Sequence, residues 1–429
     1  MTTRPTARTV ALAVVIRVVD HGGYSNLALP AALSRSGLSR ADRDLATELA
    51  YGTIRRLLLL DRALAPLLDR ALDLTPRRAL ALLRLGAYQL LFTRIPAYAA
   101  VSETVALAGP RERGFVNAVL RRLAADPPAL PRGSEAADIA ARTGLSEWAI
   151  LELRRLVGAE TEDAAAALAT RASLTLRVNR SRTTIEELER ALATAGAKTT
   201  RGRVYEGSIL VEAGSPSPLP GFRQGWFAVQ DQASSFVVGA LDPRPGERVL
   251  DACAGPGGKT GHIADLVGTH GLVAAADSQP KRAGLVRASV HRLRLRSQTL
   301  VQDARRPALR GPFDRVLVDA PCSGIGSARR RPELLWRPRA EDLSALARLQ
   351  VEIAASSAGL LGTGGRLVYS VCTFPRAETD AVCDALLLRA PFLEPLPIDG
   401  PDGPVERIRL WPHLHGTDAM FVAGFRRRN

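Results

Sequence analysis

Apolar side chains recur at helical spacing along the first 125 residues, without an alternating strand pattern among them. Helix-breaking residues separate the periodic segments at Gly22-Gly23, Thr75-Pro76 and Ile95-Pro96. The pattern predicts an all-α helical bundle over residues 1–125. Its helices are expected at 11–19, 42–59, 60–72, 77–91 and 99–107. A proline-rich stretch then predicts a linker over 126–145.

Residues 146–235 combine helical and strand patterns. Helical periodicity over 147–157 and 160–169 precedes a strand-like run at 174–179. A capped helix is expected at 184–195, followed by short strands near Val204 and at 208–211. This order predicts a small α+β subdomain.

From residue 236 to 429, strands and helices alternate regularly. Apolar runs typical of parallel strands lie at 248–254, 272–277, 298–303, 313–320 and 366–371. The alternation predicts an α/β doubly wound domain, in which ligands bind beyond the carboxyl ends of the strands. The residues at or just after those ends are therefore the candidates for chemistry: 255–259, Asp277, Asp303, Cys322 and Cys372.

The net charge of +15 in 429 residues makes a polyanion the first partner to consider. Nearly all of the positive charge is arginine, because lysine occurs only at positions 198, 259 and 281. Arginine binds phosphate through a two-pronged guanidinium group, so RNA or DNA is favoured. A solvated basic surface without a partner is the alternative.

The four cysteines are Cys253, Cys322, Cys372 and Cys383. They form no CxxC pair and have no neighbouring histidine at zinc-ligand spacing, so we expect neither a metal site nor a disulfide framework. The apolar run at 10–19 contains Arg17 and is too short to cross a bilayer. We therefore expect a cytoplasmic protein that is not associated with membranes.

A glycine-rich loop, DACAGPGGKT, spans residues 251–260 and joins the first expected strand of this domain to a helix. Glycines let the backbone approach a ligand, and a helix N-terminus offers free N–H groups. The loop is not a Walker A phosphate loop, because Cys253 stands where that motif requires glycine. Asp277 is placed to hold the ribose hydroxyls of a nucleoside cofactor, and Asp303 to bind an adenine amino group. Both could instead act only as helix caps.

Two cysteines follow two strands of the expected sheet, in DAPCSG at 319–324 and SVCT at 370–373. Cys322 and Cys372 can thus face each other across one cleft, whereas Cys383 lies in a helical pattern typical of the core. Methylation at carbon 5 of a pyrimidine uses such a pair. A thiolate adds to carbon 6, and a second group assists removal of the proton from carbon 5. Asp319 is the candidate carboxyl group at ring nitrogen 3.

These segments resemble the motifs of the RNA cytosine-5 methyltransferase family. The resemblance extends to VQDQAS at 229–234 and RRPEL at 330–334, and it covers a little under half of the chain. It implies S-adenosylmethionine as cofactor, Cys372 as nucleophile and Cys322 as the residue that assists product release. It also implies a cofactor pocket made by Cys253, Ala254, Gly255, Pro256, Gly257, Gly258, Lys259, Asp277, Arg282, Asp303 and Asp319. The chain departs from the family pattern at Gly255, Val371 and Ala419.

The N-terminal half resembles a second fold. Residues 41–56 and 87–123 are similar to the NusB-type RNA-binding fold, and 174–179 is similar to a ferredoxin-like or RRM-like subdomain. This arrangement is that of the RsmB group, which modifies small-subunit ribosomal RNA. The resemblance implies methylation of a cytosine in 16S ribosomal RNA. We expect the protein to be a monomer. The alternatives are another RNA such as tRNA, a non-catalytic RNA-binding or transcription factor, and a protein or small-molecule methyltransferase.

Overall fold

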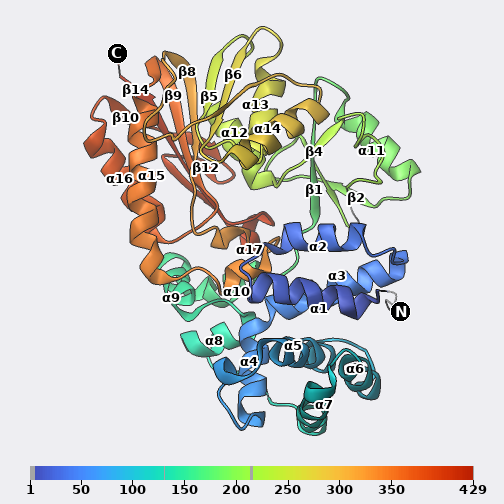
Figure 1. Cartoon of the computed structure of the whole chain (residues 1–429). Helices are drawn as coiled ribbons and strands as arrows, with labels where there is room; N and C mark the ends of the chain where they lie inside the picture. The colour runs from blue at the N-terminus through green and yellow to red at the C-terminus, as the bar shows by residue number, and fades with distance from the viewer. Residues whose placement is uncertain (1–4, 130, 213–215, 429) are drawn as a thin grey trace. The chain divides into compact units, whose positions relative to one another are not determined.

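The structure, a computed structural model, describes residues 5–129, 131–212 and 216–428. The chain forms two compact units (Figure 1). Unit 1 contains residues 1–170 together with 328–338, and unit 2 contains 171–327 together with 339–429. Each unit is described by itself.

Unit 1 is helical, as predicted. Its core includes the fully buried side chains of Val15, Leu49, Ile54, Leu82 and Leu83, which come from three helices. Helix α5 is buried on all sides over residues 79–89, and the burial of its apolar side chains against the other helices stabilises the bundle. The helices are α1 (Ala7–Val19), α2 (Ser25–Ser34), α3 (Arg40–Arg55), α4 (Leu57–Leu64), α5 (Arg77–Phe92), α6 (Ala97–Val105), α7 (Pro110–Ala125), α8 (Ala136–Thr143), α9 (Glu147–Val157) and α10 (Thr161–Leu168).

The second half of the linker predicted at 126–145 is a helix in the structure. Helix α8 lies there and packs on α9 and α4, with Ile139 buried. The prolines end before this helix begins, so they do not prevent it from forming. Helices α9 and α10 also belong to unit 1, whereas the sequence pattern predicts that the α+β subdomain begins at residue 146.

A segment distant in sequence, 328–338, completes unit 1. Glu333 is fully buried and accepts hydrogen bonds from the backbone N and the Oγ of Ser25, at 3.1 and 2.6 Å. The indole nitrogen of Trp336 donates to Ile54 O at 2.9 Å, and Arg337 donates to Val18 O at 2.8 Å. This segment carries the RRPEL motif, and its polar groups are paired mainly with the helical bundle.

Unit 2 begins with a four-stranded antiparallel sheet in the order β2-β3-β1-β4. The strands are β1 (Leu174–Val178), β2 (Thr199–Arg201), β3 (Ser208–Val211) and β4 (Phe227–Val229), and α11 (Ile185–Thr194) covers them with Leu188 and Leu192. The strand expected near Val204 is absent. The backbone N of Val204 donates instead to Gln232 Oε1 at 3.0 Å, so it does not pair with a strand.

The large sheet has the order β10-β14-β9-β8-β5-β6-β7. Its parallel strands are β5 (Arg248–Asp251), β6 (Leu272–Asp277), β7 (Gln298–Val301), β8 (Phe313–Asp319) and β9 (Leu361–Val371), and they confirm the predicted doubly wound domain. The antiparallel edge was not foreseen. It consists of β10 (Leu393–Leu396), β13 (Arg407–Leu410) and β14 (Met420–Arg427), beside the hairpin β11 (Ile398–Gly400) and β12 (Gly403–Val405) and the short helix α17 (Pro412–His415).

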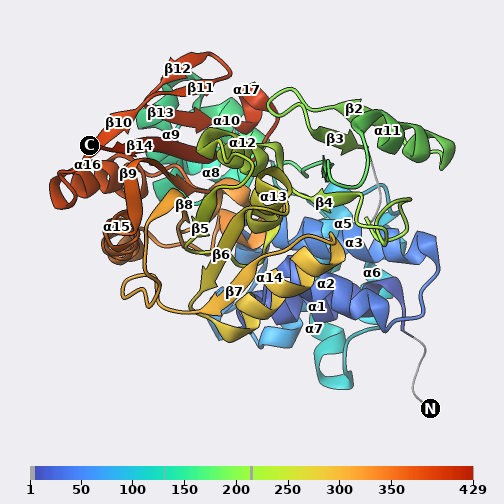
Figure 2. The ribbon, with the colours of Figure 1, turned by 90° about the horizontal axis from the view of Figure 1, so that it is seen from above.

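Helices cover both faces of the large sheet (Figures 1 and 2). Val249 and Leu317 face one layer, and their neighbours Leu250 and Val316 face the other. Because both faces are buried, the strands read as continuous apolar runs. One layer holds α12 (Gln232–Leu241), α13 (Gly258–Val267) and α14 (Pro280–Arg292), and the other holds α15 (Leu343–Ala358) and α16 (Asp380–Arg389).

A buried ion pair joins the small sheet to the helix that follows the glycine-rich loop. Arg177 of β1 lies 3.2 Å from Asp265 of α13, and both side chains are 1% exposed. Asp265 also accepts from the backbone N and the Oγ of Ser181, at 2.9 and 2.6 Å. These bonds offset the cost of burying the charges, and they place the small sheet and α13 in the same unit.

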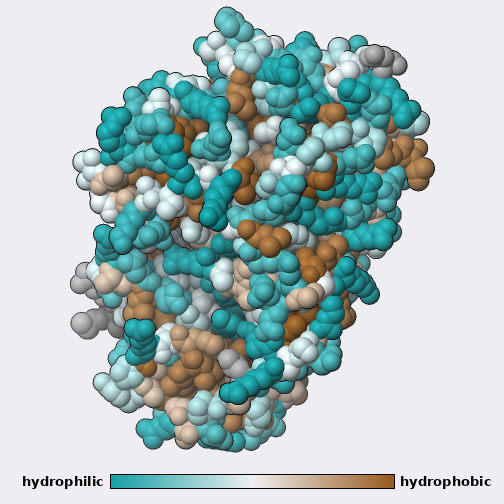
Figure 3. All heavy atoms as spheres, turned by 180° about the vertical axis from the view of Figure 1, so that it is seen from behind, coloured by the Kyte–Doolittle hydropathy of each residue, from teal (hydrophilic) through white to brown (hydrophobic). Residues whose placement is uncertain are grey.

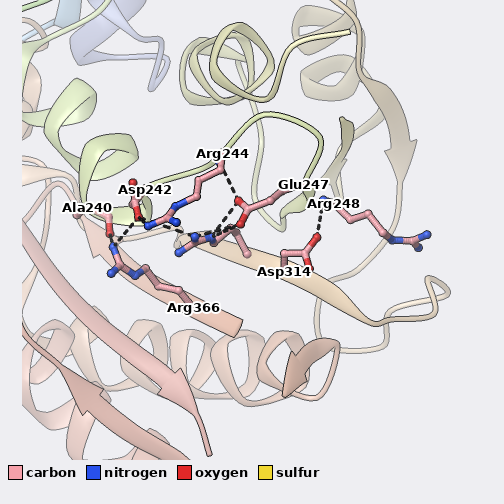
Figure 4. A network of polar contacts seen from close by, with 8 residues as sticks. Ala240, Asp242, Arg244, Glu247, Arg248, Asp314 and Arg366 are labelled. Carbon is pink, nitrogen blue, oxygen red and sulfur yellow. Dashed lines mark hydrogen bonds and ion pairs between the residues drawn. The ribbon is translucent and has the colours of Figure 1, made fainter. Parts of the chain in front are cut away.

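Arginines and acids tie the strands together at the amino end of the large sheet (Figure 4). Arg315 of β8 forms a two-pronged pair with Glu247, with N–O distances of 3.0 to 3.2 Å. Asp314 accepts from the backbone N of Arg248 at 2.8 Å, and Arg366 of β9 donates to Ala240 O at 3.0 Å. This network lies at the edge opposite to the candidate residues, so it supports the sheet without entering the site.

The surface carries no extended apolar face on the side drawn in Figure 3, where hydrophobic residues form small separate groups among hydrophilic ones. Within the described ranges, no helix has both the length and the apolar character needed to cross a membrane.

Candidate active site

The glycine-rich loop leaves β5 at Asp251 and enters α13 at Gly258. Gly257 caps this helix with a φ of 102°, and a Cβ there would lie 2.8 Å from Val286 Cα in α14. Only glycine fits at that position. No side chain caps the helix, so the amides of its first turn are available to a ligand.

Asp277 at the end of β6 holds the loop. Its Oδ2 accepts from Gly255 N at 3.0 Å and from Arg282 Nε at 2.9 Å, and its Oδ1 accepts from Gln279 N at 2.9 Å. A second guanidinium nitrogen of Arg282 donates to Gly255 O at 2.7 Å. A Cβ on residue 255 would lie 2.5 Å from Asp277 Oδ2, which gives a physical reason for Gly255, one of the departures from the family motif.

Asp303 does not join this group. Its carboxylate is held by Arg305, with N–O distances of 2.6 to 3.0 Å, and these bonds lower its pKa. It lines a cavity together with Glu352 and Arg389. The hydrogen bonds and ion pairs of the described residues do not connect Asp303 to the glycine-rich loop.

Two titratable side chains, those of Asp251 and Cys253, lie at the start of the loop. Asp251 accepts from Thr260 Oγ1 at 2.7 Å, and burial raises its pKa to about 7. Burial, with the nearby charges of Asp251 and Asp319, raises the pKa of the Cys253 thiol well above its ordinary value. Cys253 is therefore a neutral, poorly nucleophilic part of the loop.

The two other candidate cysteines meet at the carboxyl ends of neighbouring strands. Cys322 Sγ and Cys372 Sγ are 3.5 Å apart, and both residues are half-buried. Asp319 pairs in register with Ser370, whose Oγ donates to Asp319 Oδ1 at 2.9 Å. Lys259 Nζ of the glycine-rich loop donates to Asp319 Oδ2 at 2.8 Å. The sheet thus brings four predicted site residues together: Lys259, Asp319, Cys322 and Cys372.

The two sulfur atoms have different electrostatic surroundings. The hydrogen bond with Cys372, burial, and the charges of Glu378 and Asp319 raise the pKa of Cys322 well above its ordinary value. Burial alone would lower the pKa of Lys259, but Asp319 outweighs this effect and the pKa is raised. The ammonium group of Lys259 therefore stays charged, and it interacts electrostatically with Cys372.

Two departures from the family motifs lie beside the cysteines without removing a reacting group. Val371 is fully buried in the core that the sheet forms with α15 and α16. Ala419 acts through its backbone, whose N donates to Gly326 O at 2.9 Å, while Gly326 N donates to Cys372 O at 3.0 Å. A Cβ at Gly326 would lie 2.2 Å from Ala419 O, so glycine is required on that side of the contact.

Sequence reasoning missed the carboxylate that connects the two cysteine loops. Glu378 is fully buried and accepts from Ser323 N at 2.9 Å and from Ser323 Oγ at 2.5 Å. It lies six residues after Cys372, where a polar side chain usually faces solvent. The available signal was the hydroxyl residue that follows each cysteine, Ser323 and Thr373. Among the described residues, no group of three or more His, Cys, Asp or Glu side chains could hold a metal ion.

Comparison with known proteins gives the same domain order. Residues 238–426 match the family model of 16S rRNA methyltransferase RsmB/F, 5–125 match the NusB family, and 145–217 match the ferredoxin-like domain of RsmF/B-like methyltransferases. The probable ribosomal RNA small subunit methyltransferase B of Bacillus subtilis is 33% identical over 99% of both chains. The chain belongs to the RsmB/F family of 16S rRNA methyltransferases.

Other members and a solved structure are similar over most of their length. The ribosomal RNA small subunit methyltransferase B of Vibrio cholerae is 38% identical over 90% of this chain and 89% of its own. The crystal structure of PH0851 has a TM-score of 0.86 at 25% identity and covers 97% of this chain and 98% of that one. Membership of the RsmB/F family confirms the predicted methyltransferase, NusB-like and ferredoxin-like parts.

Proposed function

We propose that this RsmB/F family member transfers a methyl group from S-adenosylmethionine to carbon 5 of a cytosine in 16S ribosomal RNA, through a covalent cysteine–cytosine intermediate. The observation that carries the proposal is the pair of sulfur atoms 3.5 Å apart, beside Asp319 and Lys259. The RNA follows from the family and from the net charge of +15.

The chain's residues fit the cofactor. The side chain of Asp277 is 6% exposed and is held by three hydrogen bonds, so its orientation is fixed. Its remaining lone pairs would accept hydrogen bonds from the ribose hydroxyls of the cofactor. A Cβ at Gly258 would meet nothing within 4 Å, which leaves room for a ligand at the first turn of α13. The bound cofactor supplies an electrophilic methyl group. Arg305 forms an ion pair with the Asp303 carboxylate in this structure. We therefore propose that Asp303 binds the adenine amino group only in a rearranged site, in which Arg305 has released it.

The reaction uses the two cysteines in sequence. The Cys372 thiolate adds to carbon 6 of the flipped-out cytosine, and the ring electrons make carbon 5 nucleophilic toward the methyl group. Lys259 and Asp319 form a hydrogen-bonded pair that carries a proton. This pair stabilises ring nitrogen 3 as that nitrogen takes up electron density. After methyl transfer a base removes the proton from carbon 5. The bond between carbon 6 and sulfur then breaks and releases the Cys372 thiolate, assisted by Cys322.

Adduct trapping tests the order of these events. Cys372→Ala should abolish methylation and form no protein–RNA adduct, because the nucleophile acts before the intermediate exists. Cys322→Ala should form the adduct but release it slowly, so a denaturing gel should show an RNA-linked band for that variant. Cys383→Ala is the matched control, because Cys383 is buried in α16 and belongs to the core there.

Bisulfite sequencing of 16S ribosomal RNA, with and without the gene, tests the substrate. A cytosine that is protected only when the gene is present supports the proposal. Unchanged ribosomal RNA combined with a protected cytosine in tRNA would move the substrate to tRNA. Retained methylation in both cysteine variants, with no band in either, would rule out the covalent route.

A further inference from the structure

Each active-site cysteine is followed by a hydroxyl residue, and both hydroxyl groups converge on one buried carboxylate. Ser323 follows Cys322, and Thr373 follows Cys372. Their hydroxyl oxygens lie 2.7 Å apart. Glu378 accepts from Ser323 N and Oγ at 2.9 and 2.5 Å, and from Thr373 Oγ1 at 3.4 Å. One carboxylate thus holds the residue next to each sulfur atom.

A second buried side chain fixes the other side of Cys322. Gln350 of α15 is fully buried, and its amide nitrogen donates to Pro321 O and to Glu378 Oε1, both at 2.9 Å. Tyr369 OH donates to Glu378 O at 2.7 Å and to Gln350 Oε1 at 3.2 Å. Pro321 and Ser323 are therefore both anchored, so the backbone around Cys322 has little freedom. A network of this kind, with every member paired, fixes geometry.

Among the described residues, no cation forms an ion pair with the Glu378 carboxylate. The partners of the Glu378 carboxylate in the part of the chain that the structure describes are hydroxyl groups, a backbone amide and a side-chain amide. These neutral donors stabilise a carboxylate and leave its negative charge near Cys322.

The two sulfur atoms therefore differ in the sign of the charge near them. Cys322 interacts electrostatically with Glu378 and with Asp319 of β8, and its sulfur atom lies 3.5 Å from that of Cys372, the residue after β9. Cys372 interacts with the ammonium group of Lys259, which comes from the start of α13. Negative charge disfavours a thiolate, and a nearby cation favours it. The hydrogen bond with Cys372 and burial do most to raise the pKa of Cys322 above its ordinary value, and the charges of Glu378 and Asp319 act in the same direction.

We propose that Glu378 is the positioning residue that decides which cysteine attacks. It holds Ser323 and Thr373 so that both sulfur atoms meet, and its charge adds to the effects that favour the thiol form of Cys322, while Cys372 interacts with Lys259. The assignment of one cysteine as the attacking nucleophile rests on the proposed function. The unequal reactivity of the two thiols does not, and it can be measured without RNA or cofactor.

Alkylation of the full-length protein by iodoacetamide, followed by peptide mass spectrometry from pH 6 to pH 10, measures each thiol separately. In the wild-type protein Cys372 should react before Cys322 at every pH below that at which Cys322 ionises. In Glu378→Gln the amide preserves the shape and removes the charge. Alkylation of Cys322 should become faster on the order of tenfold near neutral pH, and its pH profile should move to lower pH, since one pKa unit is a tenfold change in thiolate fraction.

Two further variants separate charge from structure. Glu406→Gln is the same substitution at an exposed carboxylate and should leave both profiles unchanged. Glu378→Asp keeps the charge on a shorter side chain, so Cys322 should stay slow even if the loops shift. A merely structural role for Glu378 would make Gln and Asp variants alike in their alkylation profiles.

The outcomes are distinct. Faster alkylation of Cys322 than of Cys372 in the wild-type protein would overturn the proposal, and this holds even if Glu378→Gln fails to fold. Wild-type profiles in a folded Glu378→Gln would overturn it as well. If the wild-type protein forms no 5-methylcytosine in RNA, the proposed function is wrong, but the predicted order of alkylation is unaffected.

Discussion

Replacement of Asp251 by asparagine should change how the stability of unit 2 depends on pH. Asp251 ends β5, is 1% exposed and accepts a hydrogen bond from Thr260 Oγ1 at 2.7 Å. Burial raises its pKa from 3.8 to about 7, although the bond from Thr260 and the charge of Lys259 act in the opposite direction. Asparagine has nearly the same shape and is neutral at every pH, so it can still accept from Thr260.

The size and sign of the effect follow from the two pKa values. Below pH 3.8 the carboxyl group is protonated in both states, and its contribution to stability is fully present. As the pH rises from 3.8 to about 7, the unfolded chain loses its proton while the folded chain retains it, so stability falls. A shift of about 3 units, at about 1.4 kcal/mol each, corresponds to about 4 kcal/mol in total. About 2–3 kcal/mol of this falls between pH 5 and pH 8.

Urea unfolding at a series of pH values measures this difference. The free energy of unfolding of the wild-type protein, relative to that of Asp251→Asn, should fall by about 2–3 kcal/mol between pH 5 and pH 8. Asp399→Asn is the control, because Asp399 is exposed. A difference between wild type and Asp251→Asn that stays within about 0.5 kcal/mol over this range would refute the reasoning. It would mean that Asp251 does not hold a proton in the folded protein near neutral pH.

Three more outcomes are expected. Asp277→Ala should weaken binding of S-adenosylmethionine by on the order of tenfold or more in calorimetry, because it frees the loop and leaves the ribose hydroxyls unpaired. Glu333→Gln should lower the free energy of unfolding of unit 1 by about 1–3 kcal/mol in chemical denaturation, because the buried carboxylate pairs with Ser25. Arg113→Gln and Arg121→Gln, at exposed positions of α7, should reduce the slope of log RNA affinity against log salt, by about 0.7 for each phosphate that the variant no longer neutralises.

Each of these outcomes has a contrary result. Unchanged cofactor affinity in Asp277→Ala would remove that residue from the site. Wild-type stability in Glu333→Gln would mean that the 328–338 segment does not depend on this contact. An unchanged salt slope would place the RNA elsewhere than on α7. Point variants are preferable to deletion of residues 1–125, because deletion would also remove the partners of Glu333 and Trp336.

Local patterns predicted most elements because each pattern reports on a single stretch of chain. The run at 272–277 coincides with β6 and the helix at 147–157 with α9, since strong periodicity leaves few alternatives. Short elements were less readable. The strand expected near Val204 is absent, and β2 at Thr199–Arg201 was not foreseen. The antiparallel strand β14 carries no signal that separates it from a parallel strand.

The sequence by itself determined the three kinds of domain and the edge of the large sheet on which the candidate site residues lie. Apolar periodicity dictates which faces are buried, and parallel strands place their carboxyl ends on one edge, so Cys322 and Cys372 could be assigned to the same cleft. Three features were decided only by the tertiary structure. Asp303 pairs with Arg305, and residues 328–338 pack into the helical unit. Glu378 is buried between the two cysteine loops. The reason is that a polar side chain is buried only when partners from distant parts of the chain satisfy its hydrogen bonds, and the linear pattern does not record those partners.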